Sequence, residues 1–127
     1  MASDNIEIVA SVEDEKIASE IVEKVRREGV VSWQELVGVF RGKGISLYRL
    51  RKILLNLVNS GAILELQCRL FTTREFVENT EMSVLVKRIV EKVSSLRLRK
   101  CGKPVGVPYK KISVSVSRDG KISVSAQ

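Results

Sequence analysis

Residues 32–73, SWQELVGVFRGKGISLYRLRKILLNLVNSGAILELQCRLFTT, decide the fold of this chain of 127 residues. The segment opens with a capping box, because the Ser32 hydroxyl and the Glu35 carboxylate can each accept a hydrogen bond from an unpaired backbone N–H. These signals predict a short helix over residues 33–40, which the glycine-rich residues 41–44 bring to an end.

A second helix is predicted over residues 47–59, with Ser46 as its N-cap and Gly61 placed as its C-terminal stop. Beyond it, an apolar run at 62–66 and an extended segment at 70–72 are separated by a polar turn. This pattern predicts a small β-hairpin. The order of elements is therefore helix, turn, helix and hairpin.

This order resembles the winged helix-turn-helix superfamily over about residues 13–73. The resemblance implies that helix 47–59 enters the DNA major groove, and that Val30 and Val31 form a short strand beside the hairpin, the wing of that family. Winged helices also serve as protein-docking modules, so the fold alone leaves the activity open.

At 100° per residue, helix 47–59 has two faces. One face is apolar and is expected to pack on the first two helices, through Leu47, Leu50, Ile53, Leu54, Leu57 and Val58. The opposite face carries side chains that can contact phosphates or base edges, Tyr48, Arg49, Lys52, Asn56 and Asn59, with Arg51 at the boundary. Leu55 also lies on the outer face, where it would meet a thymine methyl group or a protein.

The charge distribution favours an anionic partner. The chain carries 22 basic and 15 acidic side chains, a net charge of +7. Residues 1–40 hold 4 basic and 9 acidic side chains, whereas residues 41–59 hold 5 basic and no acidic ones. Positive charge is thus concentrated on the second helix of the pair and again after residue 92, as expected of a nucleic-acid-binding protein.

A further helix is predicted to follow residues 74–79. Its apolar side chains are spaced four, three, four and three apart, like those of a coiled coil, at Met82, Val86, Ile89, Val93 and Leu96. We expect this side to form the interface of a homodimer that pairs two reading helices on a two-fold site. The alternative is that it packs on its own domain.

The C-terminal segment is basic and then alternates between apolar and polar residues. The cations of this basic arm are expected to contact phosphates, at Arg97, Arg99, Lys100, Lys103, Lys110 and Lys111. A three-residue loop at 118–120 would then form a hairpin with Val116 opposite Ile122. The apolar side of this hairpin must rest on the domain or on a partner, because an isolated hairpin is marginal in water.

The predicted class is therefore α+β, mostly α with a small β component: a winged helix-turn-helix with an extra C-terminal helix and a C-terminal β-hairpin tail. The expected parts are an N-terminal extended segment (1–11), the winged domain (12–73), a C-terminal helix with a dimerisation role (74–100), and the basic arm with its hairpin (101–127).

Several function classes are excluded by composition. The chain has no His, and its two cysteines are far apart in sequence, so we expect no metal site, no cofactor and no enzymatic activity. An intramolecular disulfide is possible, but reduced thiols are the default inside a cell. No apolar run approaches the ~20 residues of a membrane span, and the acidic N-terminus is unlike a secretory signal. We therefore expect a cytoplasmic protein without a membrane partner.

The sequence favours a double-stranded DNA-binding protein, a transcriptional regulator acting as a homodimer. Besides the C-terminal cations, the expected nucleic-acid contacts are Arg41, Lys43, Ser46, Tyr48, Arg49, Arg51, Lys52, Asn56 and Arg69. One alternative is a docking subunit of a polymerase, replication or ribosomal assembly, which would bind protein through the Leu55 face or the C-terminal hairpin. Another is RNA binding through the basic arm. The charged composition without His would suit a thermophilic archaeon or its virus.

Overall fold

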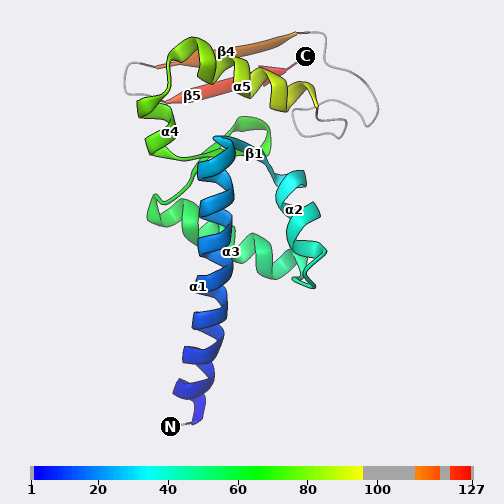
Figure 1. The fold of residues 1–127 in the computed structure, drawn as a ribbon, viewed down its shortest axis with the longest axis vertical. Helices are drawn as coiled ribbons and strands as arrows, with labels where there is room; N and C mark the ends of the chain where they lie inside the picture. Colours follow the sequence, from blue (N-terminus) through cyan, green and yellow to red (C-terminus); the bar gives the residue numbers. More distant parts are fainter. Residues whose placement is uncertain (1, 96–110, 118–120, 127) are drawn as a thin grey trace.

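The computed structural model describes the backbone of residues 2–95, 111–117 and 121–126, and side chains from residue 13 onward within these ranges. Helices dominate, and two small antiparallel sheets accompany them (Figure 1). The elements in chain order are α1 (Ala2–Glu28), β1 (Val30–Ser32), α2 (Trp33–Arg41), α3 (Leu47–Ser60), β2 (Leu64–Leu66), the 3-10 turn η1 (Gln67–Arg69), β3 (Leu70–Thr72), α4 (Arg74–Asn79), α5 (Met82–Ser94), β4 (Ile112–Val116) and β5 (Ile122–Ala126).

Helix α1 is continuous and includes residues 2–11, which the sequence predicted to be extended. That prediction was wrong because a few alternating residues do not distinguish a strand from a helix. Ile6, Val9 and Ala10 equally fit the helical spacing of three and four. A helix that has already formed downstream gains one hydrogen bond for each further residue it orders. Gly29 ends α1 in the left-handed conformation, with a φ of 83°.

The local signals for α2 and α3 are confirmed. The Ser32 N–H donates to Glu35 Oε2 at 2.7 Å, and the Glu35 N–H donates to the Ser32 hydroxyl at 3.2 Å, which completes the capping box. The Ser46 hydroxyl accepts from the Arg49 N–H at 3.2 Å at the start of α3. Gly61 ends α3 with a φ of 83°, a conformation that L side chains rarely adopt.

The central sheet has three antiparallel strands in the order β1-β3-β2. Its first strand contains Val30 and Val31 and pairs with the β2–β3 hairpin, as predicted. Between the two hairpin strands, η1 places Cys68 and Arg69 at φ values of 65° and 55°. Cys68 is disulfide-bonded, contrary to the expected reduced thiol, and the chain's other cysteine, Cys101, lies outside the described residues.

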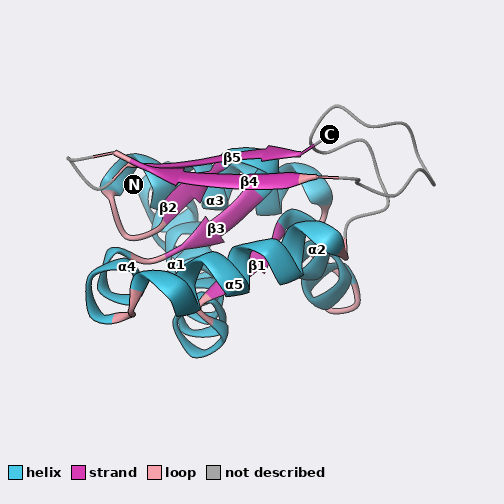
Figure 2. Ribbon diagram, turned by 90° about the horizontal axis from the view of Figure 1, so that it is seen from above, coloured by secondary structure: helices cyan, strands magenta, loops and turns pink. Residues whose placement is uncertain are grey.

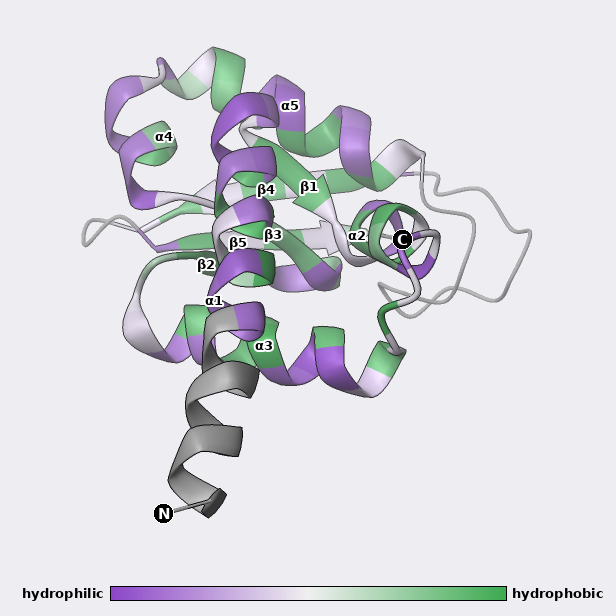
Figure 3. Ribbon diagram, turned by 60° about the horizontal axis from the view of Figure 1, so that its bottom comes forward, coloured by the Kyte–Doolittle hydropathy of each residue, from purple (hydrophilic) through white to green (hydrophobic). Residues whose placement is uncertain are grey.

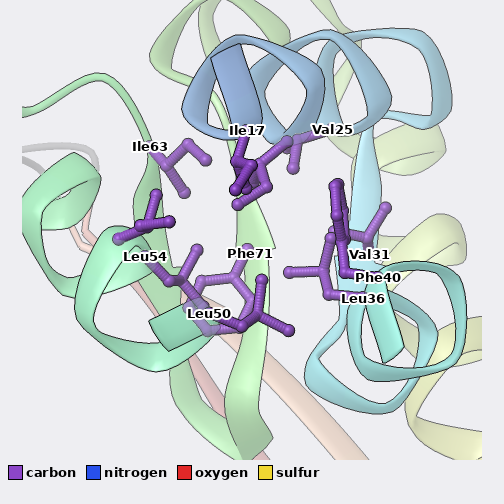
Figure 4. Packing of buried hydrophobic residues seen from close by; sticks show 11 residues of the cluster. Ile17, Val25, Val31, Leu36, Phe40, Leu50, Leu54, Ile63 and Phe71 are labelled. Atoms are coloured by element: carbon purple, nitrogen blue, oxygen red, sulfur yellow. The ribbon is translucent and has the colours of Figure 1, made fainter. Parts of the chain in front are cut away.

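Helices α1, α2 and α3 cover one face of this sheet. Their apolar side chains meet those of the strands in the first core, where Phe71 of β3 lies among residues from all three helices (Figure 4). The members of this core are Ile17, Ile21, Val25, Val31, Leu36, Phe40, Leu50, Ile53, Leu54, Ile63 and Phe71. This packing fixes the position of α3 relative to the rest of the fold.

Helix α5 and the β4–β5 hairpin cover the other face of the sheet (Figure 2). They form a second core with the strands, made of Val30, Leu66, Cys68, Leu70, Leu85, Ile89, Val93, Ile122, Val124 and Ala126. Within the hairpin, Val116 pairs with Ile122 and Val114 with Val124, which confirms the predicted register. The loop residues 118–120 lie outside the described residues.

The side of α5 that was expected to form a dimer interface is largely covered by the chain itself. Two of its five residues are fully buried in the second core, so they are not available to a second copy. Ile89 and Val93 have no exposed surface, Val86 is half-buried, Met82 is exposed, and Leu96 lies outside the described residues.

The strands of the central sheet explain why α5 packs on its own chain. Neighbouring residues of β3, Leu70 and Phe71, are both apolar and buried, so both faces of the sheet need a cover. A helix of the same chain provides that cover without the loss of translational freedom that a second copy would bring. Polar contacts also join α5 to the first layer: Lys92 Nζ lies 2.5 Å from Glu35 Oε1, and Arg88 donates to the Glu28 carbonyl at 3.0 Å.

Candidate nucleic-acid interface

The outer face of α3 is exposed. Tyr48 has 79% of its surface exposed, and Arg51, Lys52, Asn56 and Asn59 are exposed as well. Along α3, polar residues lie on the outer side and apolar residues on the side toward the sheet (Figure 3). The face predicted from the helical period is therefore present, with its centre nearer to Arg51 than to Arg49.

Apolar residues interrupt this face. Leu55 is 51% exposed, as its position on the outer face predicted. Leu47 is 44% exposed, although the helical period placed it on the packing face. Leu47 is the first residue of α3 and lies close after the turn that joins α2 to α3. Two leucines and Tyr48 thus give the outer face an apolar component beside its charges.

The predicted contact residue Arg49 is held by α1. Its side chain is 37% exposed, and its guanidinium lies 2.8 Å from Asp14 Oδ1 and 3.2 Å from Glu13 Oε2. The hydrogen bond to Asp14, followed by that to Glu13, raises the pKa of Arg49 above its ordinary value. Lys43 is paired in the same way, with Glu20 Oε2 at 3.1 Å. Two of the cations closest to the start of α3 are therefore neutralised by acids of α1.

The other cations of α3 and the cation of η1 are not neutralised in this way. Arg51, Lys52 and Arg69 are exposed, and no ion pair between described residues involves any of them. Arg69 belongs to η1, and its left-handed backbone sets its side chain at the turn of the hairpin. Free cations therefore lie on α3 and on the neighbouring hairpin turn.

A groove of about 350 Å³ lies between α3 and the β2–β3 hairpin, and we name it the α3–hairpin groove. Its lining is largely apolar, and the apolar side chains come from α2, α3 and β3, namely Trp33, Leu47, Leu54, Leu55, Val58 and Phe71. Arg51 of α3 and Arg69 of η1 also line it, together with Tyr48 and one acid, Glu65.

Other predicted site residues fare differently. Arg41 is exposed at the end of α2, and Lys111 is exposed just before β4. The Ser46 hydroxyl is occupied as the N-cap of α3. The remaining cations of the arm lie outside the described residues, namely Arg97, Arg99, Lys100, Lys103 and Lys110.

Sequence reasoning missed two features of this surface. The pairing of the acids of α1 with Lys43 and Arg49 was not predicted, although the opposite charges of residues 1–40 and 41–59 were a signal that the two helices would pair. Trp33 and Phe71 line the groove, although neither was among the predicted site residues. That position depends on how α2 and the hairpin approach each other, which the periodicity of each element does not encode.

Within the described residues, no group of three His, Cys, Asp or Glu side chains is placed to hold a metal ion. None of the helices described is both long and apolar enough to span a membrane. Comparisons with protein-family models, with curated proteins and with solved structures found no match to this chain.

Proposed function

We propose that the chain carries a winged helix-turn-helix and binds double-stranded DNA, with α3 in the major groove. In this proposal α2 and α3 are the helix-turn-helix, and the β2–β3 hairpin is a short wing. The observation that carries it is the outer face of α3, where exposed polar side chains stand beside Arg51, Lys52 and Arg69, cations that form no ion pair with any described residue.

Each part of this face has a role. Tyr48, Lys52 and Asn56 point away from the core and reach base edges or phosphates when α3 enters the groove. Arg51 and Arg69, on adjoining elements, contact phosphates on the hairpin side of the helix. The short wing limits contacts outside the major groove, so the specificity of binding resides in α3. In this proposal the protein acts as a transcriptional regulator.

The test is a titration of the full chain into labelled duplex DNA, followed by fluorescence anisotropy at 50 and 200 mM salt. The affinity should fall steeply with salt, and Arg51→Ala with Lys52→Ala should lower the slope of log K against log salt by about two, since each phosphate that is no longer neutralised accounts for roughly 0.9. The control is Lys87→Ala with Lys121→Ala, which removes the same charge from exposed positions on the other layer.

Equal changes in the two double variants would mean that only net charge matters, and the assignment of α3 would then be wrong. Single-stranded DNA and RNA of the same length serve as competitors. Preferential binding of RNA would overturn the choice of duplex DNA as partner.

A further inference from the structure

The α3–hairpin groove follows one side of α3 for most of the length of that helix. The lining residues of α3 run from position 47 to position 58, a rise of about 16 Å or about three turns. At 100° per residue they fall within a stripe of about 120°, which is centred near Arg51 and lies opposite Arg49. They are Leu47, Tyr48, Arg51, Leu54, Leu55 and Val58.

Exposed apolar side chains gather at this groove. Seven large hydrophobic side chains are exposed among the described residues, and three of them line it, namely Leu47, Tyr48 and Leu55. The cavity of about 350 Å³ holds on the order of ten water molecules. Water beside so apolar a lining has few hydrogen-bond partners there, so apolar groups that displace it gain free energy.

DNA leaves most of this lining uncovered. In the proposed function, base edges and phosphates meet polar and charged side chains of α3 and the hairpin turn. A sugar-phosphate backbone has no apolar side chains to insert into the groove, and lining atoms without partners lose dispersion energy. The groove is therefore better matched to a protein segment that carries apolar side chains.

The occupant must also carry negative charge. Arg51 and Arg69 line the groove, and neither forms an ion pair with any described residue. The lining holds one acid, Glu65, against these two cations. The acids of α1 are engaged elsewhere, since they pair with Arg49 on the opposite side of α3. Acidic side chains on the occupant would complement the two arginines.

The length of the groove favours a helix as the occupant. A small organic acid would cover only part of about 16 Å, whereas a second helix of about three turns matches that length. Its side chains at spacings of three and four form a row, as the lining residues of α3 do. Such a helix can therefore lie along α3 and insert its apolar side between α3 and the hairpin.

We propose that the α3–hairpin groove binds an acidic amphipathic helix of a partner protein, about three turns long. The apolar side of this helix fills the groove, and its acids meet Arg51 and Arg69. The inference does not rest on DNA binding. Because the same two arginines contact phosphates in the proposed function, the partner helix and DNA exclude each other at this side of α3.

A synthetic helix of defined chemistry tests this proposal. The probe is a fluorescein-labelled peptide of about 16 residues, long enough to form a helix, with leucines on one side and glutamates beside them. One control peptide has the same residues in an order that spreads the leucines around the helix, and another has lysines in place of the glutamates. Titrated with the full chain, the probe should bind at least roughly tenfold more tightly than either control in fluorescence anisotropy.

Charge reversal in the groove should change which peptide binds. Arg51→Glu with Arg69→Glu should weaken binding of the acidic peptide roughly tenfold and strengthen binding of the basic one, because the sign of the groove is then inverted. The control is Lys87→Glu with Lys121→Glu, which changes the net charge equally at exposed positions outside the groove. This control should bind the acidic peptide as the wild type does.

The apolar contact has a matched pair of variants. Leu55→Ala removes an exposed leucine of the groove and should weaken peptide binding, whereas Val84→Ala, at a similarly exposed position of α5, should not. Trp33, the chain's single tryptophan, lines the groove, so its emission should shift to shorter wavelength when the tryptophan-free peptide binds. Circular dichroism establishes that each variant is folded.

Several results would overturn the proposal. The probe could bind no more tightly than its two control peptides, or it could bind without a change in Trp33 emission or in response to the groove variants. A chain that self-associates without peptide and shifts its Trp33 emission would show that a second copy fills the groove. Uptake of decanoate in preference to the peptide would indicate a small-molecule site. No DNA is present in these samples, so the two proposals fail or stand separately.

Discussion

The acids of α1 that hold Arg49 give a quantitative prediction about DNA binding. Glu13→Gln with Asp14→Asn keeps the size of both side chains and removes the charges that lie 3.2 and 2.8 Å from the guanidinium. Arg49 then becomes free beside the outer face of α3. If α3 is the DNA-binding helix, the double variant should bind duplex DNA more tightly than the wild type.

The size of the effect follows from counterion release. One additional phosphate contact steepens the slope of log K against log salt by about 0.9. Over a fourfold rise in salt, from about 50 to 200 mM, the advantage of the variant should therefore shrink about 3.5-fold. Fluorescence anisotropy with a labelled duplex at these two salt concentrations measures both the tighter binding and its salt dependence.

The control removes two acids that pair with no described residue, Glu15→Gln with Glu81→Gln. Both positions are exposed, and Glu15 lies on the same helix as the test pair. A test variant whose affinity and salt slope equal those of this control would show that releasing Arg49 adds no phosphate contact. The reasoning that DNA lies close enough to α3 for a freed Arg49 to reach a phosphate would then be refuted.

Two further predictions concern stability. Ile89→Ala creates a cavity at a fully buried position of the second core and should lower the free energy of unfolding by about 2–5 kcal/mol in urea titrations. The control Val84→Ala, at an exposed position of the same helix, should change it by less than about 0.5 kcal/mol. An unfolding midpoint that varied with protein concentration for the α5 variants alone would instead favour an interface between copies on α5. Burial acts to raise the pKa of Glu35, but the hydrogen bonds from Lys92 and from the Ser32 N–H outweigh it and lower the pKa below 4.5. The stability that this shift contributes is present above pH 4.5 and is lost as the pH falls through the folded-state pKa. Glu35→Gln should therefore weaken the dependence of the unfolding free energy on pH in that range. A variant with the pH profile of the wild type would contradict the assignment.

The neutralised and free cations divide the α3 surface into two parts. On the α1 side, Lys43 and Arg49 are paired with acids of the same chain. On the hairpin side, Arg51 and Arg69 are free of such pairs among the described residues and border an apolar groove. An anionic partner therefore meets free cations on the hairpin side of α3, where the proposed phosphate contacts of Arg51 and Arg69 lie.

Local elements could be predicted from the sequence because their causes lie within a few residues. Ser32 and Glu35 form the capping box, and Gly61 supplies the left-handed stop, whatever the rest of the chain does. The alternation of the C-terminal strands set Val116 opposite Ile122, because a shift of one residue would have mixed the two faces. The exposed polar side of α3 followed from the helical period alone.

Only the tertiary structure decided which faces of these elements pack against each other. The helical period shows that Ile89 and Val93 lie on one apolar side of α5, but packing on the sheet and packing on a second copy would bury that side equally well. The pairing of Arg49 with Asp14 joins residues 35 positions apart, and it depends on how α1 crosses α3. Long-range contacts of this kind depend on the relative placement of whole elements, which is fixed by packing both faces of one small sheet.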